Sequence, residues 1–360
     1  MPSPRTRPRP LAAAAALLFA LFPAAAGCGQ VVHESEQAGA AERITVVDDA
    51  DREVAIDGPV RRAVVLNSYA NEFVQAIGAG DAVVGVDRVS LERLPYLGFT
   101  EDEVVSEDLS EINYEAVAEL DPDVFIVPRN GAWQEAEKQL EPFGVPVVVA
   151  TAWDFDVFHE TVDLLGQVFG ETEGAEEVSG FYDEIFDAVA QRVEGTEPVP
   201  VYWETEQPYL TVVPGSGFDR MITAAGGENV FGDVKTGGDE QAETTVDPAE
   251  VAQRDPEVIV HEFGPSADPT GPDCFEEVGG DLLDRPGWQD TPAVRDGEVY
   301  VSNGWATSGL SKAIGAAYLA SWLHPEEFED VDPEDYLRRW AEDFQGTGFD
   351  AGGDYVQKVG

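Results

Sequence analysis

Lysine and cysteine are scarce in this sequence, and both shortages limit what the protein can do. The 360 residues hold 21 Lys and Arg against 71 Asp and Glu, for a formal net charge of -50. The only lysines are Lys138, Lys235, Lys312 and Lys358. So acidic a surface repels nucleic acid and anionic lipid headgroups, which excludes both as partners. Because the acids are spread along the whole chain, they indicate a protein adapted to high salt.

The motifs of common enzymes and nucleotide-binding proteins are missing as well. We find no G-x-S-x-G elbow, no G-x-G-x-x-G after a first strand and no Walker loop. The four histidines are His33, His159, His261 and His324, and no two stand at the i, i+4 spacing that helical metal sites use. We therefore expect no catalysis, no metal site and no cofactor. The 43% hydrophobic and 10% aromatic residues are still enough for a real core.

The N-terminus reads as a targeting segment. Residues 1–27 combine an Arg-containing start, an apolar run "LAAAAALLFALFPAAA" and small residues, as a secretory signal does. The stretch "AAGC" resembles the lipobox of secreted lipoproteins, which predicts a lipid on Cys28 and a flexible tether over 28–42. The alternative is an ordinary signal that happens to contain a cysteine. If Cys28 is lipidated, Cys274 has no partner for an intrachain disulfide.

From residue 43 onward, apolar strands alternate with helices, which favours parallel sheets covered on both faces. We expect a hairpin at 44–56, a first α/β lobe over 43–154, connecting helices over 155–195 and a second α/β lobe over 196–328. A helical tail is expected over 329–360. The strands are expected at 62–66, 82–86, 123–127, 145–150, 199–204, 209–214, 257–263 and 298–302.

Two phrases repeat along the chain. "AVAELDPDVFIV" at 116–127 returns as "EVAQRDPEVIV" at 250–260, and "GAGDAVVGV" at 78–86 returns as "AGGENVFGDV" at 225–234. In the first pair an Asp-Pro turn separates a helix from a strand, because the residue before proline avoids the α region. The echoes predict one supersecondary unit used in both lobes; the alternative is chance, since Asp-Pro turns are common.

Two lobes joined by a long helix leave a cleft, where ligands usually bind. Aromatic rings and guanidinium groups at strand ends suit a bulky, partly apolar ligand with oxygen acceptors. Each aromatic residue could equally be part of the core. The candidate ligand contacts are Tyr69, Arg88, Arg129, Trp133, Trp203, Tyr209 and Trp305.

The opening "ITVVDDADREVAIDGPVRRAVVLNSYANEFVQAIGAGDAVVGV" resembles the periplasmic-binding-protein-like receptors of iron-siderophore and cobalamin ABC importers. The later stretches "YEAVAELDPDVFIV", "AAGGENVFGDV", "DPAEVAQRDPEVIV" and "RPGWQDTPAVRDGEVYVSN" match that family in order, over about residues 43–325. The resemblance implies two Rossmann-like α/β lobes with mainly parallel sheets, one long interdomain helix and a ligand between the lobes. It also implies docking onto a permease through one acid on each lobe. The first acid falls on Glu72. The position of the second is occupied by Arg220, with Asp219 beside it, so either Asp219 substitutes or the permease contact there has changed.

We therefore expect a monomeric, lipid-anchored, extracytoplasmic binding protein that carries an iron(III) chelate to an ABC permease and its ATPase. Cobalamin or another corrinoid, haem, or a bare metal ion are alternative ligands. A chelatase-like enzyme on the same scaffold is a further alternative, although no general base or metal cluster supports it.

Overall fold

The structure is a computed structural model that describes residues 42–205, 207–235, 243–263, 272–310, 312–349 and 355–360. The predicted signal peptide, nearly all of the predicted tether and Cys28 lie outside these residues, as does the side chain of Cys274. Among the described residues, none of the helices is both long and apolar enough to span a bilayer.

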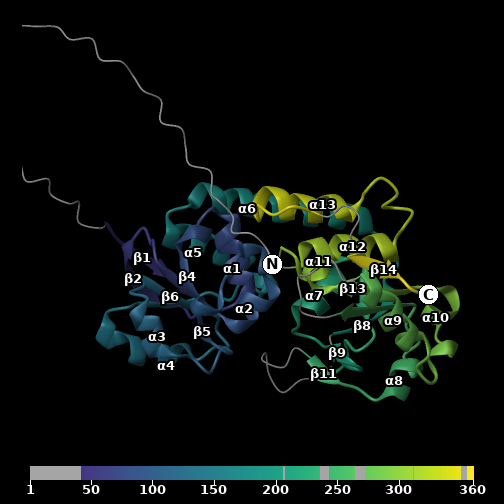
Figure 1. The fold of residues 1–360 in the computed structure, drawn as a ribbon. Coiled ribbons are helices and arrows are strands. Elements are labelled where there is room, and N and C mark those ends of the chain that lie inside the picture. The colour runs from purple at the N-terminus through teal and green to yellow at the C-terminus, as the bar shows by residue number, and fades with distance from the viewer. Residues whose placement is uncertain (1–41, 206, 236–242, 264–271, 311, 350–354) are drawn as a thin grey trace, which may run out of the picture. The chain divides into compact units, whose positions relative to one another are not determined.

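The first lobe is built on a parallel sheet of five strands in the order β5-β4-β3-β6-β7 (Figure 1). An antiparallel hairpin of β1 and β2 precedes it, as the sequence predicts. The strands are β1 (Glu42–Val47), β2 (Glu53–Gly58), β3 (Ala63–Val65), β4 (Val83–Asp87), β5 (Val104–Ser106), β6 (Val124–Val127) and β7 (Val147–Val149). The helices are α1 (Ser68–Ala76), α2 (Arg88–Arg93), α3 (Tyr114–Glu119) and α4 (Trp133–Leu140).

Two helices follow this sheet, α5 (Phe158–Phe169) and the 22-residue α6 (Thr172–Val193). Gly170 ends α5 in the left-handed region with φ 74°, a conformation that glycine adopts without strain. The chain then turns sharply, so that α5 and α6 pack against each other through Phe158 and Tyr182.

The second lobe holds a sheet of seven strands in the order β11-β9-β8-β12-β13-β14, with β10 also paired to β8. Strands β10, β8, β12 and β13 are parallel, and the outer strands β9, β11 and β14 are antiparallel. The strands are β8 (Val199–Glu204), β9 (Leu210–Val212), β10 (Gly227–Asn229), β11 (Glu243–Thr245), β12 (Val258–Phe263), β13 (Val299–Asn303) and β14 (Val356–Lys358). The helices are α7 (Gly217–Ala224), α8 (Pro248–Gln253), α9 (Pro272–Leu283), α10 (Pro292–Asp296), α11 (Gly304–Ser308), α12 (Ala313–Leu323) and α13 (Pro333–Arg339). The predicted α/β class with parallel-dominated sheets is confirmed.

The two Asp-Pro phrases fold alike. Asp121 and Asp255 both take a positive φ, 47° and 49°, at the turn between a helix and a strand. The strands that follow, β6 and β12, each lie beside the first strand of their own sheet, β3 and β8. The amide of Asp123 donates to Arg62 O at 2.8 Å, and the amide of Glu257 donates to Pro200 O at 2.9 Å. The repeated sequence therefore encodes the same helix–turn–strand unit in both lobes.

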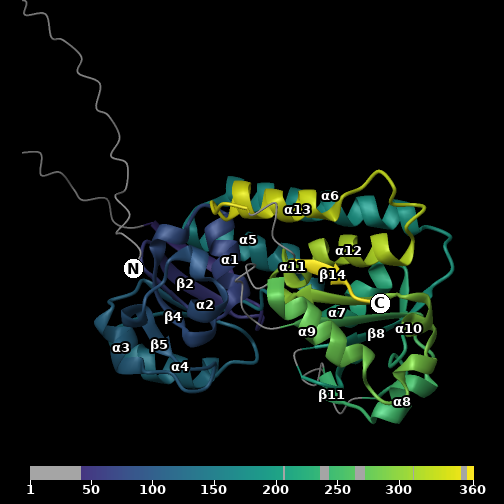
Figure 2. The same ribbon diagram turned by 45° about the vertical axis from the view of Figure 1, so that its right-hand side comes forward.

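The C-terminal tail is only partly helical, which corrects the prediction for 329–360. Helix α13 continues into a π-helical turn at Trp340–Phe344, and the chain ends as strand β14 on the edge of the second sheet. Both ribbon views place α13 alongside α6 (Figure 2). Arg339 pairs there with Glu184 of α6 at 2.5 Å. The tail thus contacts the connecting helix before it returns to the second sheet.

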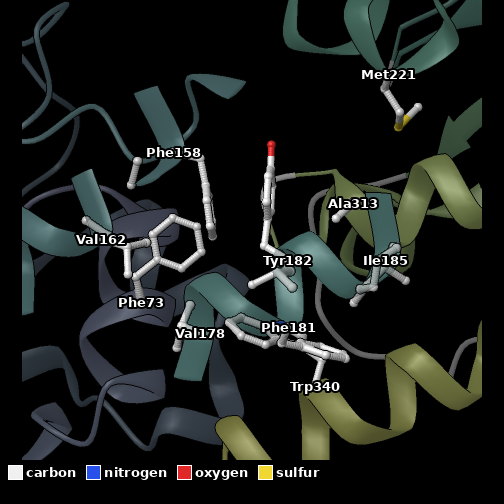
Figure 3. Close-up of a cluster of buried hydrophobic side chains, with 14 of the residues drawn as sticks. Phe73, Phe158, Val162, Val178, Phe181, Tyr182, Ile185, Met221, Ala313 and Trp340 are labelled. Carbon is white, nitrogen blue, oxygen red and sulfur yellow. The ribbon is translucent and has the colours of Figure 1, made fainter. Parts of the chain in front are cut away.

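One apolar cluster runs through both lobes. It includes Ile126 of the first sheet, Ile185 of α6 and Val260 of the second sheet, all fully buried. Figure 3 shows part of it, with the rings of Phe158 and Tyr182 face to face, 3.7 Å between centroids. The opposite faces of the two sheets are covered by separate clusters, one for each lobe. The connecting helices therefore belong to the shared core.

Candidate functional site

A cavity of about 490 Å³ lies at the carboxyl edge of the first sheet. Parallel strands end together at this edge, and their following loops converge there. Asn67 follows β3 with φ 134°, a conformation that non-glycine residues rarely adopt and that tends to mark functional positions. Its side chain accepts from the amide of Ala70 and so begins α1. The lining residues are Asn67, Ser68, Tyr69, Asp87, Val89, Arg93, Asp108, Leu109, Ser110 and Asn130.

A second, smaller cavity joins this edge to the second lobe. Its volume is about 40 Å³, which is only slightly more than the volume that one molecule occupies in liquid water. The first lobe contributes Ser68, Tyr69, Glu72, Arg93 and Leu94, and the second contributes Glu262, Gly304, Trp305, Ser308 and Gly309. Because Ser68, Tyr69 and Arg93 line both cavities, the two form one site. In this structure, protein side chains nearly fill the part between the lobes.

Glu72 is a buried acid of the site. Only 6% of it is exposed, and Tyr96 donates its hydroxyl to Glu72 Oε1 at 2.7 Å. The indole of Trp305, from the second lobe, donates in turn to the Tyr96 hydroxyl at 3.3 Å. Burial raises the pKa of Glu72 to about 7, although the hydrogen bonds and the charge of Arg93 act in the opposite direction. The carboxyl is therefore about half protonated near neutral pH.

Lys312 places a second cation beside the site. It is 4% exposed, and its Nζ lies 4.9 Å from the ring centroids of both Tyr69, on α1, and Phe218, on α7. An ammonium over a ring face is attracted by the ring quadrupole. Lys312, at φ 75°, separates α11 from α12, and its side chain lies between Tyr69 of the first lobe and Phe218 of the second.

The charge balance of the lining is negative. Asp87 and Asp108 in the larger cavity and Glu72 and Glu262 in the smaller one outnumber Arg93. Burial raises the pKa of Asp87, which accepts from the amide of Ser90 at 2.6 Å, whereas bonds from Ser110 lower the pKa of Asp108. Such a lining disfavours a ligand of high negative charge.

Two larger hollows lie at the opposite, amino-terminal ends of the strands. One, of about 790 Å³, is bordered by the Asp121 turn before β6 and by Val147, which begins β7. The other, of about 930 Å³, is bordered by Pro200 and Gly227, at the beginnings of β8 and β10. We favour the carboxyl edge because loops after parallel strands converge there and because both lobes contribute to it.

Of the seven predicted ligand contacts, the structure brings Tyr69 and Trp305 together in the smaller cavity. Arg129 follows β6 next to Asn130, and its guanidinium pairs with Asp154 at 2.9 Å. The contact of these three residues with a ligand stays a prediction.

Three other predicted contacts are engaged elsewhere. The guanidinium of Arg88 is held by Glu101 at 2.6 Å and by Glu107 at 3.2 Å. The Trp133 ring lies under Arg52, 4.4 Å from the centroid, and Tyr209 lies under Arg285 at 4.6 Å. None of the three lines either cavity.

The prediction for Trp203 is wrong. Its side chain is fully buried within β8 and stacks on Phe218 at 5.3 Å. Residues 201–204 are all buried because helices and loops cover both faces of this central strand. No part of the ring is available to a ligand.

Glu72, the first predicted docking acid, is buried in this structure, and its docking role stays a prediction. Besides Tyr96 above it, the side chain of Gln345 from the C-terminal tail donates to Glu72 O at 3.0 Å. Asp219 is half-buried and accepts from Asn229 Nδ2 at 2.7 Å, while the exposed Arg220 pairs with Asp156 at 2.5 Å. The docking role of Asp219 stays a prediction.

Several site residues escaped the sequence analysis, which looked for rings and cations after strands. Arg93 ends a helix that the sequence did not predict, and Glu262 lies inside strand β12 between His261 and Phe263. Asn67, Asp87 and Asn130 could have been found, because each stands at the carboxyl end of a predicted parallel strand. In the described part of the chain, no three His, Cys, Asp or Glu side chains are placed to hold a metal ion.

Comparison with known proteins agrees with this architecture. Residues 64–303 match the model of a family described as "Periplasmic binding protein". The chain is 26% identical over 178 residues to the vitamin B12-binding protein of Vibrio parahaemolyticus, covering 48% of this chain and 62% of that protein. It is 28% identical over 230 residues to the cobalamin-binding protein of Halobacterium salinarum, covering 62% and 59%. The match thus spans about six tenths of these relatives.

Longer coverage is found with the molybdate-binding protein MolA of Haemophilus influenzae, 24% identical over 343 residues, 86% of this chain and 92% of MolA. The structure of MolA bound to molybdate superposes with a TM-score of 0.70 at 21% identity, covering 85% of this chain and 99% of that one. At this identity the likeness shows the shared fold. All three relatives are named as binding proteins, which agrees with the expectation that the chain is not an enzyme.

Proposed function

Since this chain belongs to the periplasmic-binding-protein family, we propose that it is the substrate-binding component of an ABC importer. It acts outside the cytoplasm, held to the membrane by a lipid on Cys28, and its partners are a permease and an ATPase. The observation that carries the proposal is the cavity at the carboxyl edge of the first sheet, which continues through Tyr69 and Arg93 to residues of the second lobe. A ligand held there contacts both lobes.

For the ligand, we propose a bulky metal chelate without a high negative charge. The acidic lining supports this charge, and the rings of Tyr69 and Trp305 support a large ligand with apolar faces. A corrinoid is the first ligand to test, because two relatives are named for vitamin B12 or cobalamin. The iron(III) chelate expected from the sequence is the second, and a cationic or neutral ferric hydroxamate fits the lining better than a ferric tricatecholate.

Isothermal titration calorimetry of the mature protein tests this proposal. The ligands are cyanocobalamin, a ferric hydroxamate, a ferric tricatecholate, haem and molybdate. We expect saturable binding of cyanocobalamin or the hydroxamate and at least tenfold weaker binding of the tricatecholate and molybdate. Binding of molybdate alone, or of no ligand in the panel, would refute the proposed ligand class.

Two tyrosine variants test where the ligand binds. Tyr69→Ala removes a ring that lines both cavities, and Tyr114→Ala removes a partly buried ring at the start of α3, outside both. We expect at least a tenfold loss of affinity for the first and no change for the second. Equal losses would show that the ligand binds elsewhere.

A further inference from the structure

Glu72 stands at a point where three parts of the chain meet. It lies on α1 of the first lobe, the Tyr96 hydroxyl covers it, and Trp305 of the second lobe bonds to that hydroxyl. The Tyr96 and Trp305 rings also pack edge to face, with centroids 5.9 Å apart. Through this chain of contacts, a first-lobe carboxyl is tied to the second lobe within the site itself.

The C-terminal tail closes the other side of α1. Gln345 donates to Glu72 O at 3.0 Å, and the Trp340 ring packs edge to face on Phe73 at 6.4 Å. The same tail continues to β14, which pairs with β13 of the second sheet. Helix α1 is therefore held between two second-lobe connections, one through Trp305 and one through the tail.

The small size of the interlobe cavity shows what these contacts achieve. With about 40 Å³ available, no chelate reaches between the lobes while Trp305 and the other lining residues stay in place. A ligand that contacts both lobes requires Trp305 to move away from the first lobe, which breaks its bond to Tyr96 and admits water to Glu72.

We propose that Glu72, with Tyr96 and Trp305, forms an interlobe latch that keeps the empty receptor closed, and that protonation of Glu72 strengthens it. This inference rests on the proposed function for its biological meaning, but the latch itself is tested without a ligand. Glu72 acts here as a positioning residue.

The direction of the pH effect follows from burial. The closed state raises the pKa of Glu72 to about 7, chiefly because burial disfavours the charged carboxylate. An exposed glutamate titrates near 4.5, so the closed state binds the extra proton between these values. Closure is favoured at low pH and weakens as the pH rises through 7; between pH 6 and 8 the open fraction grows about tenfold.

The neighbouring ionisable groups do not reverse this direction. The pKa of Tyr96 lies well above 10 because of burial and the nearby Glu72, so its hydroxyl stays protonated. Arg93 and Glu262 line the same cavity, and Glu262 accepts from the Thr307 hydroxyl at 3.0 Å. The groups from the tail and α11, namely Gln345, Trp340 and Trp305, carry no charge.

Hydrogen–deuterium exchange of the mature, ligand-free protein tests the latch. The readout is the protection of segments 88–97 and 304–310, corrected for the intrinsic effect of pH. In the unaltered protein we expect faster exchange of both segments at pH 8 than at pH 6. In Tyr96→Phe, exchange should be about tenfold faster at both pH values, because the interlobe hydrogen bond from the Trp305 indole to the Tyr96 hydroxyl is lost.

Two further variants make the outcome decisive. Glu72→Gln cannot ionise, so its two segments should exchange at pH 8 at least as slowly as those of the unaltered protein at pH 6. Tyr114→Phe, on α3, should match the unaltered protein throughout. The proposal is overturned if Tyr96→Phe exchanges like Tyr114→Phe, or if Glu72→Gln keeps the full pH dependence.

Discussion

Arg285 and Glu204 form a deeply buried ion pair, with side chains 13% and 0% exposed. The guanidinium donates to both carboxylate oxygens, at 2.7 and 2.8 Å, and its faces lie 4.6 Å from the ring centroids of Tyr209 and Trp288. Burial alone would raise the pKa of Glu204, but hydrogen bonds from His261 and Arg285 outweigh it and lower that pKa. The pair therefore stays ionised at the carboxyl end of β8.

Arg285→Ala should destabilise the protein by about 3–5 kcal/mol at pH 7, because it leaves a carboxylate buried without its main partner. In the unaltered protein, the stabilising contribution of Glu204 is present above about pH 4.5 and is lost as the pH falls through its lowered pKa. The variant should lose this dependence. Urea unfolding at pH 7 and pH 4 measures both effects, with the exposed Arg295→Ala as the control. Equal stabilities of the two variants would show that the pair contributes nothing.

The sequence could not predict which individual side chains are buried in the core and which line the site. Trp203 and Trp305 both stand near the end of a strand, yet one is fully buried and the other lines the site. A central parallel strand is covered on both faces, so alternation cannot show which ring points where. The sequence analysis assigned Tyr69 and Trp305 to loops that face the site. The burial of Glu72, in contrast, depends on Tyr96 and on Gln345 of the C-terminal tail, 273 positions later in the chain. No local sequence pattern predicts such a contact.

At the scale of whole elements, helix α6 depends on close approach at one end. A Cβ added to Gly174 would lie 2.2 Å from the carbonyl oxygen of Ile77, at the end of α1. A Cβ added to Gly180, two turns later in the same helix, would meet no atom within 4 Å. Close packing against α1 therefore requires a glycine at position 174, whereas position 180 has room for a side chain.

Gly174→Ala should destabilise the protein although alanine favours helices, because α1 and α6 must move apart; about 1–3 kcal/mol is expected. Gly180→Ala should stabilise it by about 0.5–1 kcal/mol, through helix propensity alone. Thermal unfolding followed by circular dichroism compares the two. A stabilised Gly174→Ala would mean that the contact between these helices yields easily.

Elements that lie in an extended apolar stretch could be predicted from the sequence, and those without one could not. The hairpin and the Val-rich strands followed from their patterns, and the Asp-Pro echo correctly identified α3–β6 and α8–β12 as equivalent units. Strands β3, β7 and β9 have only three residues each but lie within longer apolar stretches, whereas the three-residue strands β5, β10, β11 and β14 do not. Strand β14 forms because β13 offers it an edge, which is a property of the folded sheet.

For the molecule as a whole, the net charge of -50 sets the response to salt. Self-repulsion destabilises the compact state, and the screening length falls from about 10 Å at 0.1 M salt to about 3 Å at 1 M. We expect the melting temperature to rise by several degrees between 0.1 and 2 M KCl. Sucrose, which does not screen charge, is the control. A flat or falling melting temperature in KCl would contradict the prediction of adaptation to high salt.

The shared apolar cluster has a consequence for biosynthesis. The ring of Phe73, in the first lobe, packs against Phe158 at 5.4 Å and against Trp340 at 6.4 Å. During synthesis Phe73 and Phe158 emerge well before Trp340, which follows Phe73 by 267 positions. One side of helix α1 therefore stays exposed to water until Trp340 has emerged and packed against it.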